Sequence, residues 1–423
     1  MIKKILSHSF WLLLGNSIGR LSMFLTNIIA ARILSQETFG EFSMIRNTIS
    51  MIEGIISGTF GSPTVKRVAE ISNDNKQNLT TVIKSIFILN LLISIILASL
   101  ILILSPYIVK TFFIGKEGMM QGLYIGSVIL VTTTLSGFIQ NIFIGLEEYN
   151  KLAKSSIYAS LVSFPLILIL INYFELYGAL WGVALYFFFD FLIKYLQLKR
   201  IGIFSNNSID FSIVLQESKK LLLFSYPLLG SIVLTSISFW YARVIIVESD
   251  GFGPIAIFDA AFQWLSIIML ITGATTSVVL PILSKINLTK DLKEYKKTIL
   301  INISVNLIIS SFFAFIFSFF SKEIMSIYGE NYIEGYKVLV ILSVTAIFFS
   351  LSSIMNKIYI SLGYTKEILY IVSFSAISML FLLKSNLLYS TIGLAYAFLY
   401  FYILNFLLYS LRIFILKKSI YEL

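Results

Sequence analysis

Runs of about 20 predominantly apolar residues recur along the whole chain and are separated by short polar segments. A run of this length can cross the hydrocarbon core of a bilayer as an α-helix, which satisfies its backbone hydrogen bonds internally. The runs predict an all-α polytopic membrane protein with twelve transmembrane helices. The predicted helices lie near residues 9–31, 42–62, 82–108, 119–145, 155–173, 178–197, 219–243, 254–282, 297–320, 336–358, 367–384 and 388–411.

The composition agrees with a chain that lies almost entirely in a membrane. Of the 423 residues, 57% are hydrophobic and 13% are charged. The formal charge of +10 comes from Lys and Arg residues scattered between the apolar runs, so nucleic acid is not an expected partner. The chain has no Cys and a single His, His8, which excludes disulfides and thiolate metal sites. We therefore expect no metal and no cofactor.

The positions of the basic residues predict the orientation. If both termini are cytoplasmic, 23 of the 32 Lys and Arg residues fall in inside segments, eight fall in outside segments, and Arg20 lies within a span. An excess of this kind is typical of cytoplasmic loops. We therefore expect the N and C termini in the cytoplasm.

A weak internal repeat divides the chain into halves. A shift of 211 residues brings residues of the first span onto the seventh, namely Gly19, Ala31 and Arg32 onto Gly230, Ala242 and Arg243. After a two-residue insertion, Arg46 aligns with Asp259. Six helices separate the two copies, so both halves have the same orientation and form a parallel repeat about an axis along the membrane normal. The predicted domains are a six-helix bundle at 1–200, a cytoplasmic linker at 201–218 and a second six-helix bundle at 219–423.

Polar residues within the spans fall on single helix faces. At about 100° per residue, Asn16, Arg20 and Asn27 lie within about 40° of one another on the first helix. A second stripe begins at Arg46 and includes Glu53, and a third begins at Asp259 in the eighth span. Such stripes avoid lipid, so they face other helices or a wet cavity.

Bland interpretations exist for each of these residues. The stripes can act as interhelical hydrogen-bond partners, and Arg20 and Glu53 can form a purely structural ion pair. Arg32, Arg46 and Arg243 lie near the outer ends of spans, where long side chains can snorkel to the interface. The Asp190 and Lys194 pair in the sixth span, like Lys84, is expected to be interfacial or to act in gating rather than to bind substrate.

Four segments carry a resemblance to a known family. They are "AARILSQETFGEFSMI" (30–45), "LYGALWGVALYF" (176–187), "SYPLLGSIVLTSI" (225–237) and "GFGPIAIFDAAFQWLSIIMLITGATTSVVLPILSK" (251–285). In order and spacing the chain resembles, from about residue 5 to 412, the polysaccharide-biosynthesis flippases of the O-antigen type. These belong to the multidrug/oligosaccharidyl-lipid/polysaccharide exporter superfamily.

The resemblance implies a transporter of two six-helix bundles that is not an enzyme. Such a protein moves an undecaprenyl-pyrophosphate-linked oligosaccharide, for O-antigen, capsule or a similar polysaccharide, from the cytoplasmic to the periplasmic leaflet by alternating access. It would lie in the bacterial cytoplasmic (inner) membrane, as a monomer among membrane lipids, with other polysaccharide-assembly proteins as further candidate partners. Arg20 matches the position of the cavity Arg in related flippases, whereas the repeat places Ser231 at that point of the second half.

The candidate site residues follow from the stripes and the resemblance. A cavity for an anionic pyrophosphate needs positive charge and hydrogen-bonding groups, and cation coupling needs a carboxylate. The substrate-binding candidates are Arg20, Asn16, Asn27, Arg46, Arg32 and Arg243, and the ion-coupling candidates are Glu53 and Asp259.

Two alternatives stay open. A cation-coupled drug exporter of the same superfamily would share the fold, although Arg20 argues against a cationic substrate. A membrane polysaccharide polymerase or glycosyltransferase would be an enzyme, but such enzymes place their catalytic groups on substantial outer loops. The longest outer segment expected here, 321–336, is short and lacks a His/Arg cluster.

Overall fold

The structure is a computed structural model of the chain. It describes the backbone of residues 19, 21–71, 76–200, 211–277, 279, 283, 292–385 and 390–421, and within these ranges it contains only helices. By its internal contacts the chain divides into two compact units, Met1–Ile232 and Val233–Leu423. The predicted linker lies partly outside the described residues, because residues 201–210 are not among them.

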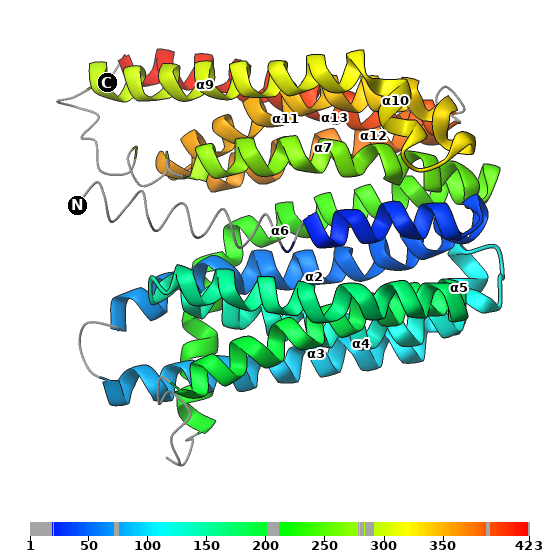
Figure 1. The fold of residues 1–423 in the computed structure, drawn as a ribbon. Helices are drawn as coiled ribbons and strands as arrows, with labels where there is room; N and C mark the ends of the chain where they lie inside the picture. Colours follow the sequence, from blue (N-terminus) through cyan, green and yellow to red (C-terminus); the bar gives the residue numbers. More distant parts are fainter. Residues whose placement is uncertain are drawn as a thin grey trace. The chain divides into compact units, whose positions relative to one another are not determined.

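Unit 1 is built around helix α4, Gly118–Gly145. This helix packs against α2 (Gln36–Ile71), α3 (Lys76–Phe112) and α5 (Tyr149–Arg200) (Figure 1). A short apolar helix, Leu21–Ile33, precedes α2. The contact between α4 and α2 needs small residues, because a Cβ atom added at Gly126 would lie 2.9 Å from Cδ1 of Ile49.

The element α5 contains two helices that fold back on each other. The break lies at Glu175, whose φ of 45° is in the left-handed region that ends a right-handed helix. A Cβ atom added at Gly182 in the second half would lie 2.7 Å from Cγ1 of Ile167 in the first half. The two halves correspond to the predicted spans 155–173 and 178–197, which are therefore confirmed as separate helices.

Unit 2 is built around helix α11, Tyr336–Ser361. It packs against α7 (Gly253–Ser277), α9 (Leu292–Phe319) and α13 (Thr391–Tyr421), and α12 (Thr365–Lys384) packs on α13. Two short elements, α10 (Ser321–Ser326) and the 3₁₀-helix η1 (Glu330–Gly335), join α9 to α11. Helix α6, Phe211–Asp250, contains the division between the units and contributes its C-terminal part to unit 2.

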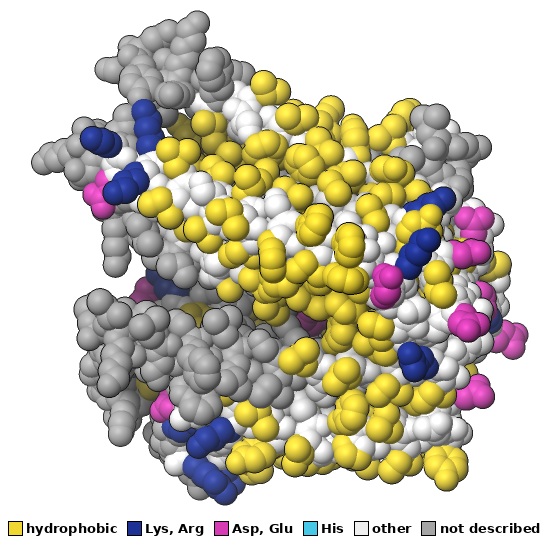
Figure 2. All heavy atoms as spheres, turned by 45° about the horizontal axis from the view of Figure 1, so that its top comes forward, with side chains coloured by type: hydrophobic (Ala, Val, Ile, Leu, Met, Phe, Trp, Pro, Cys, Tyr) yellow, Lys and Arg dark blue, Asp and Glu magenta, His cyan; other side chains and the backbone are white. Residues whose placement is uncertain are grey.

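The described part of the chain forms a polytopic membrane protein. Nine of its helical segments are long and apolar enough to cross a membrane, from Leu79–Phe112 to Thr391–Ile413. Figure 2 shows that hydrophobic side chains cover the middle of the helices on the face in view, whereas charged side chains gather near the helix ends. Helix α2 is 36 residues long but is not among the nine, because Arg46, Glu53 and other polar residues interrupt its apolar surface.

Candidate functional site

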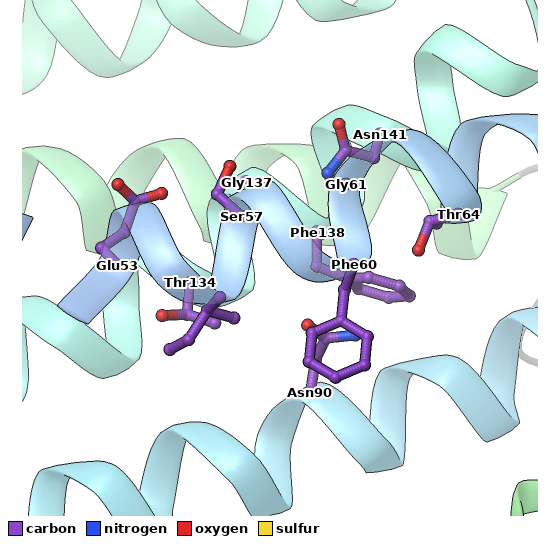
Figure 3. A pocket seen from close by; sticks show the side chains of 11 residues that line it. Glu53, Ser57, Phe60, Gly61, Thr64, Asn90, Thr134, Gly137, Phe138 and Asn141 are labelled. Carbon is purple, nitrogen blue, oxygen red and sulfur yellow. The ribbon is translucent and has the colours of Figure 1, made fainter. Parts of the chain in front are cut away.

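Unit 1 contains a polar pocket between α2, α3 and α4 with an empty volume of about 290 Å³. Its residues recur at three- and four-residue spacing, so one face of α2 and one face of α4 form most of the wall. Figure 3 shows their side chains around the opening. The lining residues are Glu53, Ile56, Ser57, Phe60, Gly61, Thr64, Asn90, Thr134, Gly137, Phe138 and Asn141.

The polar atoms of the pocket are only partly used by the protein. Asn90 donates its side-chain N–H to the carbonyl of Ile86 over 2.9 Å, which leaves its amide oxygen as an acceptor. The hydroxyl of Thr64 is buried and has no hydrogen-bond partner among the described residues. Within the same part of the chain, no hydrogen bond or ion pair holds the Glu53 carboxylate. The pocket therefore offers hydrogen-bonding groups to a ligand.

Two glycines set the shape of this pocket. A Cβ atom at Gly61 would lie 3.3 Å from Nδ2 of Asn141, so the glycine allows that amide to approach α2 closely. A Cβ atom at Gly137 would meet nothing within 4 Å, so this position faces open space. Gly61 therefore brings the walls together, and Gly137 leaves room between them.

A cation lies on α2 two turns before Glu53. Nη1 of Arg46 donates a hydrogen bond of 2.6 Å to Oδ1 of Asn27 on the preceding helix, and its guanidinium carbon lies 5.4 Å from the ring centre of Phe42. Asn27 is buried and Arg46 is half-buried. Because the amide of Asn27 is neutral, this bond orients the guanidinium without cancelling its charge.

In unit 2, Arg243 on α6 is enclosed by a carboxylate and aromatic rings. Its Nε lies 3.1 Å from Oδ1 of Asp259 on α7, and its Nη1 donates to the carbonyl of Phe239 over 3.0 Å. The guanidinium carbon lies 5.1, 5.0 and 5.3 Å from the ring centres of Phe258, Phe262 and Phe398. Arg243 is 4% exposed, so the interpretation that it snorkels to an interface is wrong.

A second buried ion pair lies in unit 1, in the last half of α5. Nζ of Lys194 is 2.6 Å from Oδ2 of Asp190, and both side chains are almost fully buried. Ser136 on α4 contacts the same carboxylate oxygen, and Lys194 donates to Oε1 of Gln140 over 3.4 Å. The pair was expected to be interfacial or to act in gating; its burial contradicts the interfacial interpretation, and it ties α5 to α4.

The predicted stripes fare unequally. Asn16 and Arg20 lie outside the described residues. Asn27 and Arg46 contact each other, Glu53 lines the pocket, and Asp259 pairs with Arg243. Arg32 is exposed at the end of its helix.

The sequence analysis missed the pocket residues outside the stripes. Asn90 and Asn141 each stand as a lone amide in an otherwise apolar stretch, "FILNLLI" and "FIQNIFI", and this signal could have marked them. Thr64 was missed because the second span was expected to end near residue 62, whereas α2 continues to Ile71.

Comparison with known proteins identifies the family. A family model described as "Polysaccharide biosynthesis protein" matches residues 5–287, which is more than half of the chain. The chain belongs to this family. None of the curated proteins compared with the chain matches it.

Solved structures share the fold of this family member. The lipid II flippase MurJ, in an inward closed conformation, matches with a TM-score of 0.73 and 17% identity over 95% of this chain and 87% of that chain. An inward-facing multidrug resistance MATE family transporter of the MOP superfamily matches with a TM-score of 0.68 and 16% identity over 96% and 99% of the two chains. A MOP superfamily transporter from Pyrococcus furiosus matches with a TM-score of 0.65 and 18% identity over 98% and 96%. The fold is therefore that of MOP superfamily transporters, and it agrees with the prediction of a transporter rather than an enzyme.

Proposed function

We propose that the protein is a flippase that moves an undecaprenyl-pyrophosphate-linked oligosaccharide from the cytoplasmic to the outer leaflet of the bacterial cytoplasmic membrane by alternating access. The oligosaccharide would serve O-antigen, capsule or a similar surface polysaccharide. In this proposal twelve spans form two bundles, 1–200 and 219–423, related by the parallel repeat and joined at 201–218, with both termini in the cytoplasm. The protein would act as a monomer, among membrane lipids.

One observation carries the proposal: a member of the polysaccharide biosynthesis protein family has the fold of MurJ, which flips lipid II. A polysaccharide pathway that assembles its repeat units on a lipid needs a step that moves the polar head group across the bilayer. A membrane-spanning member of such a family with a flippase fold is suited to this step.

The charges of unit 1 support an anionic substrate. The repeat aligns Arg32 with Arg243 and Arg46 with Asp259, so unit 1 carries two cations where unit 2 carries an ion pair. A charge pair at 4 Å gives about 4 kcal/mol at an effective dielectric of 20, so one or two Arg residues can hold a pyrophosphate without trapping it. We propose Arg46, oriented by Asn27, as a substrate contact. Arg20, Asn16 and Arg32 stay predictions from the sequence.

Energy coupling stays a prediction for Glu53 and Asp259. The ion pair with Arg243 supports a structural role for Asp259, because a carboxylate that already neutralises a buried cation cannot bind a second one without breaking that pair. Glu53 lines the pocket and has a different role in the inference below.

Translocation by the purified chain tests the proposed function. The protein is reconstituted in proteoliposomes with lipid-linked oligosaccharide extracted from the host strain, and the share of sugar that a non-permeant glycosidase can reach is followed in time. Protein-dependent exposure of sugar from the inner leaflet is expected. Equal exposure in protein-free vesicles, together with protein-dependent efflux of a cationic dye, would favour a drug exporter instead.

Arg20 offers a test of the sequence prediction. If Arg20 contacts the head group, Arg20→Ala should lower surface polysaccharide and raise the inner-leaflet pool of lipid-linked oligosaccharide, at unchanged protein level. Arg20→Lys should retain transport if charge alone matters. Normal polysaccharide in Arg20→Ala would remove Arg20 from the site.

A further inference from the structure

We infer that the pocket between α2, α3 and α4 binds an uncharged sugar ring of the lipid-linked oligosaccharide, an inference that rests on the proposed function. The pocket is a site for the glycan part of the substrate, separate from the cation that meets the pyrophosphate. The chemistry of the lining, the unused polar atoms, the size and the position along α2 all point to this ligand.

The lining has the chemistry of a carbohydrate site. Sugar hydroxyls both donate and accept hydrogen bonds, and the pocket offers the carboxylate of Glu53 and the amides of Asn90 and Asn141. The rings of Phe60 and Phe138 supply apolar surface for the C–H face of a sugar. Small-molecule sites combine an apolar wall with a few convergent polar groups in this way.

The charge of the lining selects against an anion. Among the described residues that line the pocket, Glu53 is charged and none is Lys or Arg. A phosphate or a uronic acid would face this carboxylate at close range in a medium of low dielectric, where like charges repel strongly. The ligand is therefore an uncharged sugar, such as a hexose or an N-acetylhexosamine.

The hydroxyl of Thr64 supplies an independent indication of a ligand. Thr64 is 1% exposed and lines the pocket, yet its Oγ1 has no hydrogen-bond partner among the described residues. An unpaired buried hydroxyl costs free energy, because it has lost its bonds to water. A bound sugar hydroxyl would restore one hydrogen bond at this position. Figure 3 shows the hydroxyl of Thr64 on the side of α2 that faces Asn90.

The size and position of the pocket fit one ring near the pyrophosphate. Its empty volume of about 290 Å³ lies at the lower end of small-molecule sites, which range from roughly 300 to 1,000 Å³. Glu53 follows Arg46 by two helical turns on the same face of α2, about 10 Å along the helix at about 1.5 Å per residue. A pyrophosphate at Arg46 would therefore bring one of the first sugars of the chain to the pocket.

Binding of two lipids tests the inference. The full-length chain is purified in detergent, and Kd is measured by native mass spectrometry for undecaprenyl pyrophosphate and for lipid-linked oligosaccharide extracted from the host strain. We expect the wild-type protein to bind the sugar-bearing lipid at least tenfold more tightly. Gly137→Leu, which adds a side chain in open space, should bring this ratio close to one, and Thr64→Val should lower it several-fold, with Kd for undecaprenyl pyrophosphate unchanged.

Thr59→Val is the matched control. Thr59 is a buried threonine of the same helix whose hydroxyl donates to the carbonyl of Ile55 over 2.6 Å, and it does not line the pocket. Its substitution should leave both Kd values unchanged. The unchanged affinity of each pocket variant for undecaprenyl pyrophosphate shows that the variant is folded.

Each contrary outcome has a defined meaning. If the wild-type protein binds both lipids equally, or if Gly137→Leu and Thr64→Val keep the tenfold preference, the sugar is held elsewhere and the inference is wrong while the proposed function stands. Loss of affinity for both lipids alike in the two variants would also overturn it. A sodium-dependent affinity for undecaprenyl pyrophosphate that Thr64→Val abolishes would make the pocket a cation site. If the wild-type protein binds neither lipid, the proposed function fails and the inference fails with it.

Discussion

Arg46 in unit 1 and Arg243 in unit 2 show two ways of holding a cation in a membrane protein. Arg46 is half-buried and bonds to the neutral amide of Asn27. Arg243 is buried, pairs with the carboxylate of Asp259 and lies against three phenylalanine rings. The first arrangement orients a charge, whereas the second neutralises and encloses one.

The repeat explains how the difference arises. Arg243 aligns with Arg32, and its partner Asp259 aligns with Arg46. One position therefore holds a carboxylate in unit 2 and a guanidinium in unit 1. Two cations at the positions of an ion pair repel each other and attract an anion. A single exchange of charge thus distinguishes a position that stabilises its unit from one suited to substrate binding.

The largest expected effect is on the stability of unit 2. Arg243→Ala leaves the buried carboxylate of Asp259 without its counter-ion, which typically costs about 3–5 kcal/mol. We expect a large fall in the melting temperature of the purified protein. Arg243→Met combined with Asp259→Leu removes both charges and should recover most of the loss. An Arg243→Ala protein as stable as wild type would show that the pair is not structural.

The next effect is on transport and belongs to unit 1. Arg46→Asp gives unit 1 the carboxylate that unit 2 carries at this point of the repeat, so the attraction for an anionic head group becomes repulsion. Surface polysaccharide should fall at least tenfold, a change of about 1.4 kcal/mol or more. Arg46→Lys keeps the charge and should retain a large part of transport. Wild-type polysaccharide in Arg46→Asp, at equal protein level, would remove Arg46 from the pathway.

A smaller effect tests the aromatic enclosure of Arg243. A cation over an aromatic ring contributes about 0.5–2 kcal/mol, depending on burial. Phe398→Leu should therefore destabilise unit 2 more than Phe317→Leu, a buried ring of the same unit that lies against Trp264 instead. A double-mutant cycle between Phe398 and Arg243 should give a coupling of about 1 kcal/mol. A coupling near zero would mean that the rings act by packing alone.

The smallest effect is expected at Arg32, the counterpart of Arg243 in the repeat. Arg32 is exposed at the end of its helix, so Arg32→Ala should change stability by no more than about 0.5 kcal/mol. Thermal unfolding of Arg32→Ala and Arg243→Ala in the same detergent compares the two positions directly. Equal destabilisation would show that equivalent positions in the repeat have equivalent roles.

The sequence predicted the helices better than their contacts. Runs of apolar residues gave the all-helical membrane fold, and the break at Glu175 lies between two predicted spans because the apolar runs themselves stop there. The enclosure of Arg243 could not be predicted, because Phe398 is 155 residues away in sequence and only packing brings α13 to α6.

The same limit applies to the pocket. Helical periodicity placed Glu53 and Ser57 on one face of α2, but it does not say which helix that face meets. Asn90 and Thr134 join them because α3 and α4 pack against α2, and that choice of neighbours depends on the fit of side chains along whole helices.

One measurement tests most directly the claim that unit 1 carries the charge for the substrate while the ion pair of unit 2 is structural. Translocation of lipid-linked oligosaccharide in proteoliposomes is compared for Arg46→Ala and for the double variant Arg243→Met, Asp259→Leu, at equal amounts of folded protein. The account predicts at least a tenfold lower rate for Arg46→Ala and a rate close to wild type for the double variant. A normal rate for Arg46→Ala with a strongly reduced rate for the double variant would contradict it.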